Sequence, residues 1–227
     1  LHSVSIEKRY PGIDGVGVIA SVPRPKLEEF LRTTRADQAA DFALKNLTDA
    51  TNDLLVIKQI EPEERHRAVL GWDMSGDPER LAVAQRARDT AAAAMTSTLR
   101  MMDNGREAQR GFLMLLPVYQ RGAPVGTEAE RRANLEGWVY GLFISDQLMR
   151  GILENQSMTL GFEVFDGLKP DQDKQIFAAT QSPTAKPGYR PRFSDVVPVK
   201  LAGHTWTLRF TSTPAFDAKI PRDLSTL

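Results

Sequence analysis

The sequence has 227 residues, and its 29 Lys and Arg residues balance its 29 Asp and Glu residues, so the formal net charge is zero. This balance gives no electrostatic signature of a nucleic-acid partner or of an anionic membrane surface. The absence of cysteine excludes disulfides, thiol catalysis and zinc–thiolate sites. No apolar run approaches the length of a transmembrane helix, no signal peptide is visible, and the chain starts at Leu1, so we expect a fragment of a longer or processed protein.

The first part of the chain alternates predicted strands and helices. Proline and glycine mark the boundaries, because both residues interrupt regular elements. Tyr10-Pro11-Gly12 therefore ends a helical tail or lead-in. The expected elements that follow are a strand over residues 16–22, a helix that begins at Pro25, and strands over residues 42–47 and 53–61. Residues 61–65 are expected to form a turn or the start of a short solvated loop.

The best-marked helix starts after Asp77. The Asp77 carboxylate is a suitable N-cap, because it can accept the free amide protons of the first turn. Pro78 then fits the first helical position, where no amide proton is needed. Apolar residues recur at spacings of three and four, which predicts a narrow buried stripe. The residues of this stripe are Leu81, Ala84, Ala87 and Ala91.

Two apolar strands are expected after a short strand and a polar loop. Residues 111–119 are apolar on both faces, which predicts a central strand that is covered on both sides. Residues 137–144 carry large side chains on both faces and also predict a strand. Ser145 is then expected to cap a helix over residues 146–155.

The last part of the chain is richer in predicted strands. Short strands are expected over residues 162–165 and 176–180, with a proline-rich exposed loop over residues 182–192. The Ala202-Gly203 turn joins residues 196–201 and 204–211 into a predicted β-hairpin. This change of pattern places the start of a smaller β-rich domain near residue 157.

Few residues carry a signal of catalysis or metal binding. The histidines His2, His66 and His204 lack a trustworthy second ligand nearby, and we interpret them as surface residues. No nucleophile–base motif or phosphate-binding loop is present. N-capping and salt bridges explain Asp73, Asp77 and Asp89 as well as acid–base chemistry does. Three aromatic residues either line a pocket or pack in the core: Trp72, Trp138 and Tyr140.

Several motifs, in this order and spacing, resemble a CHASE domain over about residues 10–145. The resemblance implies an extracytoplasmic sensor of the kind found between two transmembrane helices in bacterial histidine kinases, diguanylate cyclases and adenylyl cyclases and in plant cytokinin receptors. It implies an α+β fold with two PAS-like lobes, antiparallel sheets with flanking helices, after a stalk helix that is largely missing here. The motifs are Tyr10-Pro11-Gly12-Ile13, Leu70-Gly71-Trp72-Asp73, residues 75–80 and 86–90, Leu116-Pro117-Val118-Tyr119 and Gly137-Trp138-Val139.

The resemblance also implies an organisation of the chain. Residues 1–9 are the expected end of the stalk helix or a lead-in, and residues 10–156 the membrane-distal, ligand-binding lobe. Residues 157–216 are the expected membrane-proximal lobe, and residues 217–227 a linker to a transmembrane helix. We expect flanking helices outside this chain to anchor it in the inner membrane, facing the periplasm, and the full-length receptor to be a homodimer.

The expected ligand site lies in the membrane-distal lobe. Cytokinin receptors place an adenine-binding aspartate near the start of the helix after the LGWD-like motif, and a gapless alignment puts Arg80 there. A guanidinium beside a helix N-terminus favours a carboxylate or similar anion rather than adenine. The alternative is a local pair of Arg80 with Asp77 or Asp73. The full set of expected ligand-binding residues is Arg80, Met102, Leu115, Trp138, Tyr140 and Gly141.

The sequence therefore predicts a sensor module for a small molecule, without catalytic residues, metal, cofactor or nucleic-acid partner. A histidine kinase or a diguanylate cyclase is the expected output domain. Two alternatives remain open at this stage. One is a small extracytoplasmic hydrolase, and the other is a dimerisation spacer without a ligand.

Overall fold

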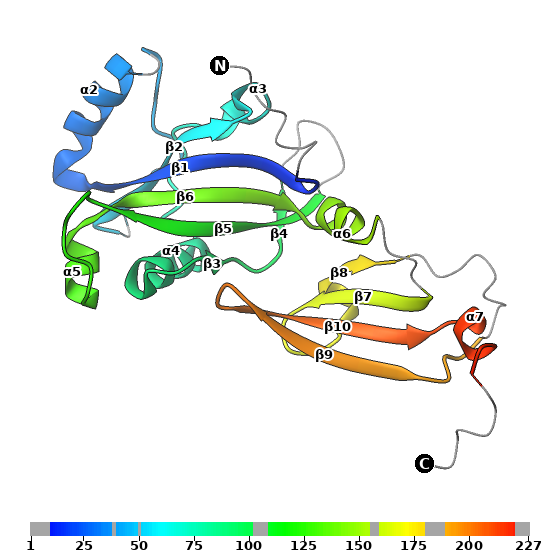
Figure 1. Ribbon diagram of the computed structural model, residues 1–227. Helices are drawn as coiled ribbons and strands as arrows, with labels where there is room; N and C mark the ends of the chain where they lie inside the picture. The colour runs from blue at the N-terminus through cyan, green and yellow to red at the C-terminus, as the bar shows by residue number, and fades with distance from the viewer. Residues whose placement is uncertain are drawn as a thin grey trace. The chain divides into compact units, whose positions relative to one another are not determined.

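The computed structural model describes residues 10–37, 40–49, 51–101, 109–154, 159–179 and 189–220. The chain forms two compact units, each built on an antiparallel sheet with flanking helices (Figure 1). The first lobe comprises Ile13–Thr96 and Phe112–Phe143, and the second lobe comprises Leu1–Gly12, Ser97–Gly111 and Ile144–Leu227. The predicted α+β class with two antiparallel sheets is confirmed. The sequence predicts contiguous lobes that meet near residue 156, whereas these units interleave; which lobe is membrane-distal stays a prediction.

The sheet of the first lobe has the strand order β2-β1-β6-β5-β3. β4 pairs with residues 109–111 of β5, and both of these stretches belong to the second lobe. Strands predicted near residues 16–22, 53–61, 111–119 and 137–144 are present. Ile19 on the central strand β1 lies opposite both Ile57 on β2 and Trp138 on β6, so these three residues share one face. The strands are β1 (Ile13–Pro23), β2 (Asp53–Glu61), β3 (Ala94–Met95), β4 (Leu99–Met101), β5 (Gln109–Tyr119) and β6 (Leu135–Ile144).

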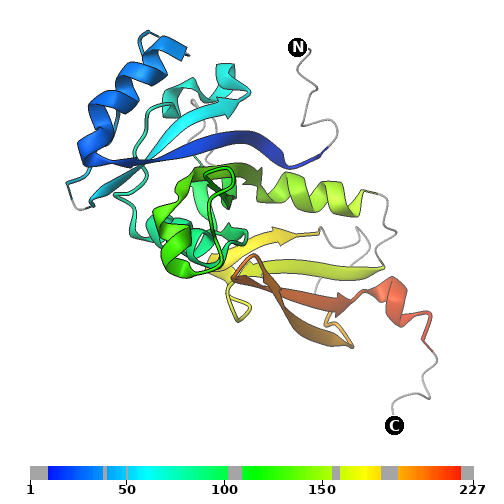
Figure 2. The same cartoon turned by 60° about the vertical axis from the view of Figure 1, so that its left-hand side comes forward.

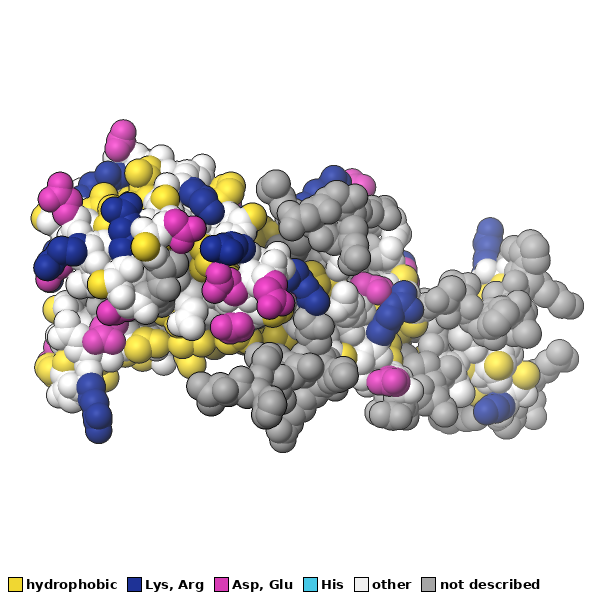
Figure 3. Space-filling view, turned by 90° about the horizontal axis from the view of Figure 1, so that it is seen from above, with side chains coloured by type: hydrophobic (Ala, Val, Ile, Leu, Met, Phe, Trp, Pro, Cys, Tyr) yellow, Lys and Arg dark blue, Asp and Glu magenta, His cyan; other side chains and the backbone are white. Residues whose placement is uncertain are grey.

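Helices cover the two faces of this sheet, α2 (Leu27–Asp37) on one and α4 (Pro78–Thr90) on the other (Figure 1). On the α2 side, helix residues pack on a buried cluster that includes Val22 and Leu54. On the α4 side the helix buries Val83, Ala84 and Ala87 against the sheet. Two short helices, α3 (Glu63–His66) and α5 (Glu128–Ala133), complete the lobe. Acidic and basic side chains are interspersed on the face of this lobe in Figure 3.

Four expectations about this lobe and the following helix are wrong. Residues 42–47 form no strand: only Lys45 bridges to Trp72, and Phe42 instead packs under α2. Residues 63–66 form α3 rather than a turn or loop. Ala91 is not buried; it is the exposed C-cap of α4, with φ of 52°. Ser145 is not the cap of α6 (Ser145–Leu153), because Ile144 holds that position and the Ser145 hydroxyl makes no cap hydrogen bond.

Strand β5 is covered on both faces over only part of its length. Phe112, Leu113 and Leu115 are buried, as expected for a central strand. Leu116, however, is 51% exposed, and the short neighbour β3 pairs only with Met114 and Leu115. The prediction of a strand covered on both sides is therefore right for its middle and wrong for its end.

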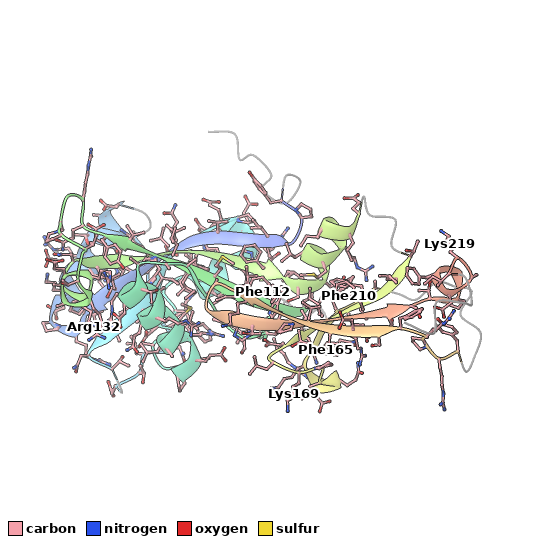
Figure 4. The ribbon with its side chains drawn as sticks, turned by 60° about the horizontal axis from the view of Figure 1, so that its bottom comes forward. Phe112, Arg132, Phe165, Lys169, Phe210 and Lys219 are labelled. Atoms are coloured by element: carbon pink, nitrogen blue, oxygen red, sulfur yellow. The ribbon has the colours of Figure 1, made fainter. Side chains whose placement is uncertain are left out.

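The second lobe contains a four-stranded sheet with the order β8-β7-β10-β9 (Figures 1 and 2). The hairpin predicted around Ala202-Gly203 is confirmed, and both turn residues have positive φ. Phe165 on β7 and Phe210 on β10 are labelled in Figure 4. β9 lies at the edge of the sheet and is exposed along its length. The elements are β7 (Leu160–Asp166), β8 (Gln175–Ala178), β9 (Ser194–Leu201), β10 (His204–Ser212), α6 and α7 (Pro214–Asp217).

Most of the predicted proline-rich loop lies outside the described residues, as do His2 and the expected lead-in over residues 1–9. In the part of the chain that the structure describes, no helix is both long enough and apolar enough to cross a membrane.

Candidate functional site

The start of α4 is fixed by its own sequence. The Asp77 carboxylate accepts hydrogen bonds from the backbone amides of Glu79 at 3.0 Å and Arg80 at 3.1 Å. Pro78 occupies the first helical position, where it sacrifices no hydrogen bond. The predicted N-cap is confirmed, and it has a consequence for ligand binding. The first-turn amides that an anion would use are already occupied by the Asp77 carboxylate.

Arg80 lies at the edge of a cavity of about 590 Å³ that is lined by the start of α4 and the turn before it. Its Nε lies 3.4 Å from Asp77 Oδ2, an ion pair within the first turn. The same Nε is buried, and it has no hydrogen-bond acceptor among the described residues. The distance to Asp77 is long for a charge-assisted hydrogen bond, so we describe the contact as an ion pair. The local pairing considered from the sequence is therefore present.

Asp73, beside this cavity, has a structural role. Its side chain is fully buried, and its carboxylate accepts backbone amides of Leu55 at 3.1 Å, Ser75 at 2.9 Å and Thr48 at 3.4 Å. These three donors come from β2, the turn before α4 and the segment before β2. Asp73 thus joins three stretches of the first lobe, which explains the aspartate of the LGWD-like motif without a catalytic or ligand-binding role.

A second cavity, of about 360 Å³, lies between α4 and the sheet, and we call it the Trp138 cavity. Polar side chains supply most of its surface, because three of its apolar residues are nearly fully buried: Leu55, Ala84 and Trp138 are each at most 3% exposed. A cavity of this volume with a few placed polar groups can hold a small ligand. The residues that line it are Ser21, Thr51, Asn52, Asp53, Leu55, Leu81, Ala84, Gln85, Arg88 and Trp138.

Helix α4 forms one wall of this cavity through a single stripe. Leu81, Ala84, Gln85 and Arg88 are spaced by three, four and seven residues from Leu81, so they share one helix face. The Trp138 indole Nε1 donates to the Ala84 carbonyl at 3.0 Å and joins this stripe to β6. The stripe was visible in the sequence for Leu81 and Ala84, but Gln85 and Arg88 were missed because polar residues were excluded from it.

The far end of the α4 wall is held by charged groups. Arg88 pairs with Asp89 at 2.6 Å, and Arg132 of α5 reaches the same carboxylate at 2.8 Å. Hydrogen bonds from Arg132 and then Arg88 hold the pKa of Asp89 well below its usual range. The backbone carbonyl of Asp89 also accepts from Arg131 Nε at 2.8 Å. These bonds fix the last turn of α4 to α5, and so fix the position of Arg88.

The other residues predicted for the ligand site lie elsewhere. Tyr140 shares the face of Trp138, but it is buried outside both cavities, opposite Gly17. Its hydroxyl has no partner among the described residues, and burial raises the pKa of Tyr140. Leu115 is buried opposite Ala94 on β3.

Gly141 lies on the opposite face of the sheet from Trp138 and Tyr140, because neighbouring strand residues alternate between faces. The expected free space beside it is taken by Phe143: a methyl group on Gly141 would lie 2.8 Å from the Phe143 ring. Met102 lies outside the described residues. Of the five predicted residues that the structure describes, Trp138 alone lines the Trp138 cavity, and Arg80 alone lines the neighbouring one.

Two histidines are not plain surface residues. His66 Nε2 lies 3.4 Å from Asp14 Oδ2, and the His66 side chain is only 12% exposed. His204 pairs with Asp166 in the second lobe, and the Thr98 amide donates to the same carboxylate at 2.7 Å. Burial would raise the pKa of Asp166, but the hydrogen bonds from His204 and Thr98 lower it overall. Across the described ranges, no group of three or more His, Asp or Glu side chains could hold a metal ion.

Comparison with known proteins gives one family. Residues 1–177 match the family model described as CHASE domain. No curated protein sequence matches the chain. Among solved structures, the chain is similar to the periplasmic sensory domain of the Campylobacter jejuni chemoreceptor Tlp1, with a TM-score of 0.47 and 9% sequence identity over 92% of this chain and 75% of that chain. A likeness at that level carries no argument about function.

Proposed function

This chain belongs to the CHASE domain family, and from that premise we propose that its first lobe binds a small molecule in the Trp138 cavity. The chain is an extracytoplasmic sensor domain of a membrane receptor. A sensor needs a site whose occupation changes the protein, and a helix packed over a sheet can transmit such a change. The receptor type is part of the proposal: a histidine kinase or a diguanylate cyclase, anchored by flanking helices and acting as a homodimer.

The observation that carries the proposal is the Trp138 cavity itself. It is about 360 Å³ in volume, within the range of small-molecule sites, and one of its walls is α4. The wall is held in the middle of the stripe by the hydrogen bond from Trp138 to Ala84 and at its end by the ion pair of Arg88 with Asp89. A ligand that entered between α4 and β1 would therefore act on a defined element rather than on a loose loop.

The test is a thermal-shift screen of this chain with small acids, amines and purines. Ligand at a hundredfold excess over Kd stabilises the folded state by about 2.7 kcal/mol, which raises Tm measurably. Ser21 lines the cavity from β1, so Ser21→Leu should fill it and abolish the shift given by a hit. Val18→Leu, on the opposite face of the same strand, is the matched control and should keep the shift.

Three outcomes would contradict this proposal. A hit that shifts Ser21→Leu as strongly as the wild type does not bind in the Trp138 cavity. The absence of any stabilising compound would favour the dimerisation spacer, and turnover of a compound in the screen would favour the hydrolase.

Arg80 supports a second candidate site, for an anionic ligand in the neighbouring cavity of about 590 Å³. The supporting observation is the buried Nε without a hydrogen-bond acceptor among the described residues. The occupied first-turn amides and the Asp77 ion pair count against it. Arg80→Ala should weaken a carboxylate hit bound here by about 2 kcal/mol or more, as for other desolvated charge pairs. Unchanged affinity would remove Arg80 from the site.

A further inference from the structure

Several polar side chains around the Trp138 cavity have no partner in the part of the chain that the structure describes. The described residues offer no hydrogen bond or ion pair to the side chains of Ser21, Asn52, Asp53 and Gln85. Thr51 differs, because its hydroxyl lies 2.9 Å from that of Ser75. Asn52, Asp53 and Gln85 are exposed, whereas Leu55, Ala84 and Trp138 are buried. The surface of the cavity is therefore supplied mainly by polar side chains, several of which have no partner among the described residues, with Leu55, Ala84 and Trp138 buried behind them.

The charged side chains at the opening of this cavity differ in whether they have an ion-pair partner among the described residues. Asp53 begins β2 and has no ion pair with any described residue. Arg88, the cation of the same cavity, is already engaged, since its Nε and Nη2 both donate to Asp89. Arg24, which bonds the neighbouring Thr51 carbonyl at 2.7 Å, has Asp49 as its carboxylate partner at 3.5 Å. The uncompensated charge at the cavity is thus the Asp53 carboxylate.

We propose that the ligand of the Trp138 cavity carries a protonated amino group, and that Asp53 is the residue that binds it. This assignment rests on the proposed function of the first lobe as the binding site. A carboxylate attracts an ammonium group and accepts hydrogen bonds from it, and the ammonium group has up to three N–H donors. The amide oxygens of Asn52 and Gln85 and the hydroxyl of Ser21 are further acceptors for such a donor. The half-buried Leu81 is the apolar side chain that can contact the rest of the molecule.

The assignment is tested with matched pairs of compounds that differ only in an amine or a hydroxyl group. The pairs are ethanolamine and ethylene glycol, 1,4-diaminobutane and 1,4-butanediol, and L-alanine and L-lactate. Calorimetric titration of the chain should show at least tenfold tighter binding of an amine than of its hydroxyl counterpart. Any hit from the wider screen is titrated in the same way, beside its own hydroxyl counterpart.

Two variants test whether Asp53 is the residue that causes the tighter binding of amines. Asp53→Asn keeps the size of the side chain and removes its charge, so the amine preference should fall about tenfold. Glu61→Gln makes the same change at the other end of β2, outside the cavity, and should leave the preference intact.

Equal binding of the members of each pair overturns the ammonium assignment, and so does a preference that Asp53→Asn leaves unchanged. In both cases a compound that binds wild type but not Ser21→Leu keeps the sensor proposal standing. If no compound of the pairs or of the screen binds, the sensor proposal fails and this assignment fails with it.

Discussion

The indole nitrogen of Trp138 on β6 donates a hydrogen bond to the backbone carbonyl of Ala84 on α4, at 3.0 Å and away from solvent. Through this bond a buried aromatic side chain joins the sheet of the first lobe to its helix wall. Trp138→Phe keeps an apolar ring but removes the donor and part of the volume. We expect a loss of about 1–3 kcal/mol in the free energy of unfolding, measured by urea denaturation. Val139→Leu, at the partly exposed neighbouring position, should change it by less than about 0.5 kcal/mol.

The buried carboxylate of Asp73 predicts a larger effect. Asp73→Ala leaves three backbone amides of the first lobe without their acceptor, and it should cost about 3 kcal/mol or more in unfolding free energy. Asp53→Ala is the control, because it removes an exposed carboxylate without an internal partner and should cost less than about 0.5 kcal/mol. Similar losses for the two variants would contradict the structural role given to Asp73.

The ion pairs of Asp89 predict a pH dependence of stability. The pKa of Asp89 is lowered in the folded state by hydrogen bonds from Arg132 and Arg88. Its contribution is therefore fully present above the unfolded-state pKa of about 4 and is lost as the pH falls toward the folded value. Urea denaturation of wild type and Asp89→Asn should show a difference at pH 6 that shrinks as the pH falls below about 4. Asp37→Asn, at the exposed end of α2, should unfold with the same free energy as the wild type at both pH values. The prediction is refuted if the difference in unfolding free energy between wild type and Asp89→Asn does not change with pH.

Position 12, in the second lobe, should accept no residue other than glycine. Its φ is +92°, and a methyl group on it would lie 2.4 Å from the Cα of Leu148 on α6. Gly12→Ala should cost about 2 kcal/mol or more, through backbone strain and the displacement of α6. Gly126→Ala, where the added carbon would meet Glu130 at an ordinary 3.4 Å, should change the thermal midpoint little. Equal thermal unfolding midpoints for both variants would mean that residue 12 is not in close contact with Leu148 on α6.

Local signals explain why parts of the fold could be predicted from the sequence. Asp77 and Pro78 act on amides within one helical turn, so the start of α4 needed no tertiary knowledge. The Ala202-Gly203 hairpin is equally local. Residues 42–47 show the limit: their alternating pattern fits a strand, yet Phe42 is buried by α2 and only Lys45 finds a backbone partner.

The candidate site depended on contacts between distant parts of the chain. Ser21, Asp53 and Gln85 meet because β1 pairs antiparallel with β2 and α4 crosses the same face. No spacing in the sequence relates these three residues. Trp138 was predicted for the pocket, while Gly141 was placed there although strand alternation turns it to the other face. The buried interactions of Asp73 and the histidine–aspartate pairs were missed for the same reason, since their partners lie far apart in sequence.

The exposed edge strand of the second lobe has a consequence for how the protein behaves at high concentration. Pro198 lies opposite Thr207 in the middle of β9. Because proline has no amide hydrogen, its nitrogen has to face the open edge, where an incoming strand would find no donor. Lys200 places a charge two residues further along the same strand, and a charged side chain on an edge strand also opposes the addition of another strand. The valines of β9 can therefore stay accessible to solvent without this strand seeding open-ended growth of the sheet from molecule to molecule.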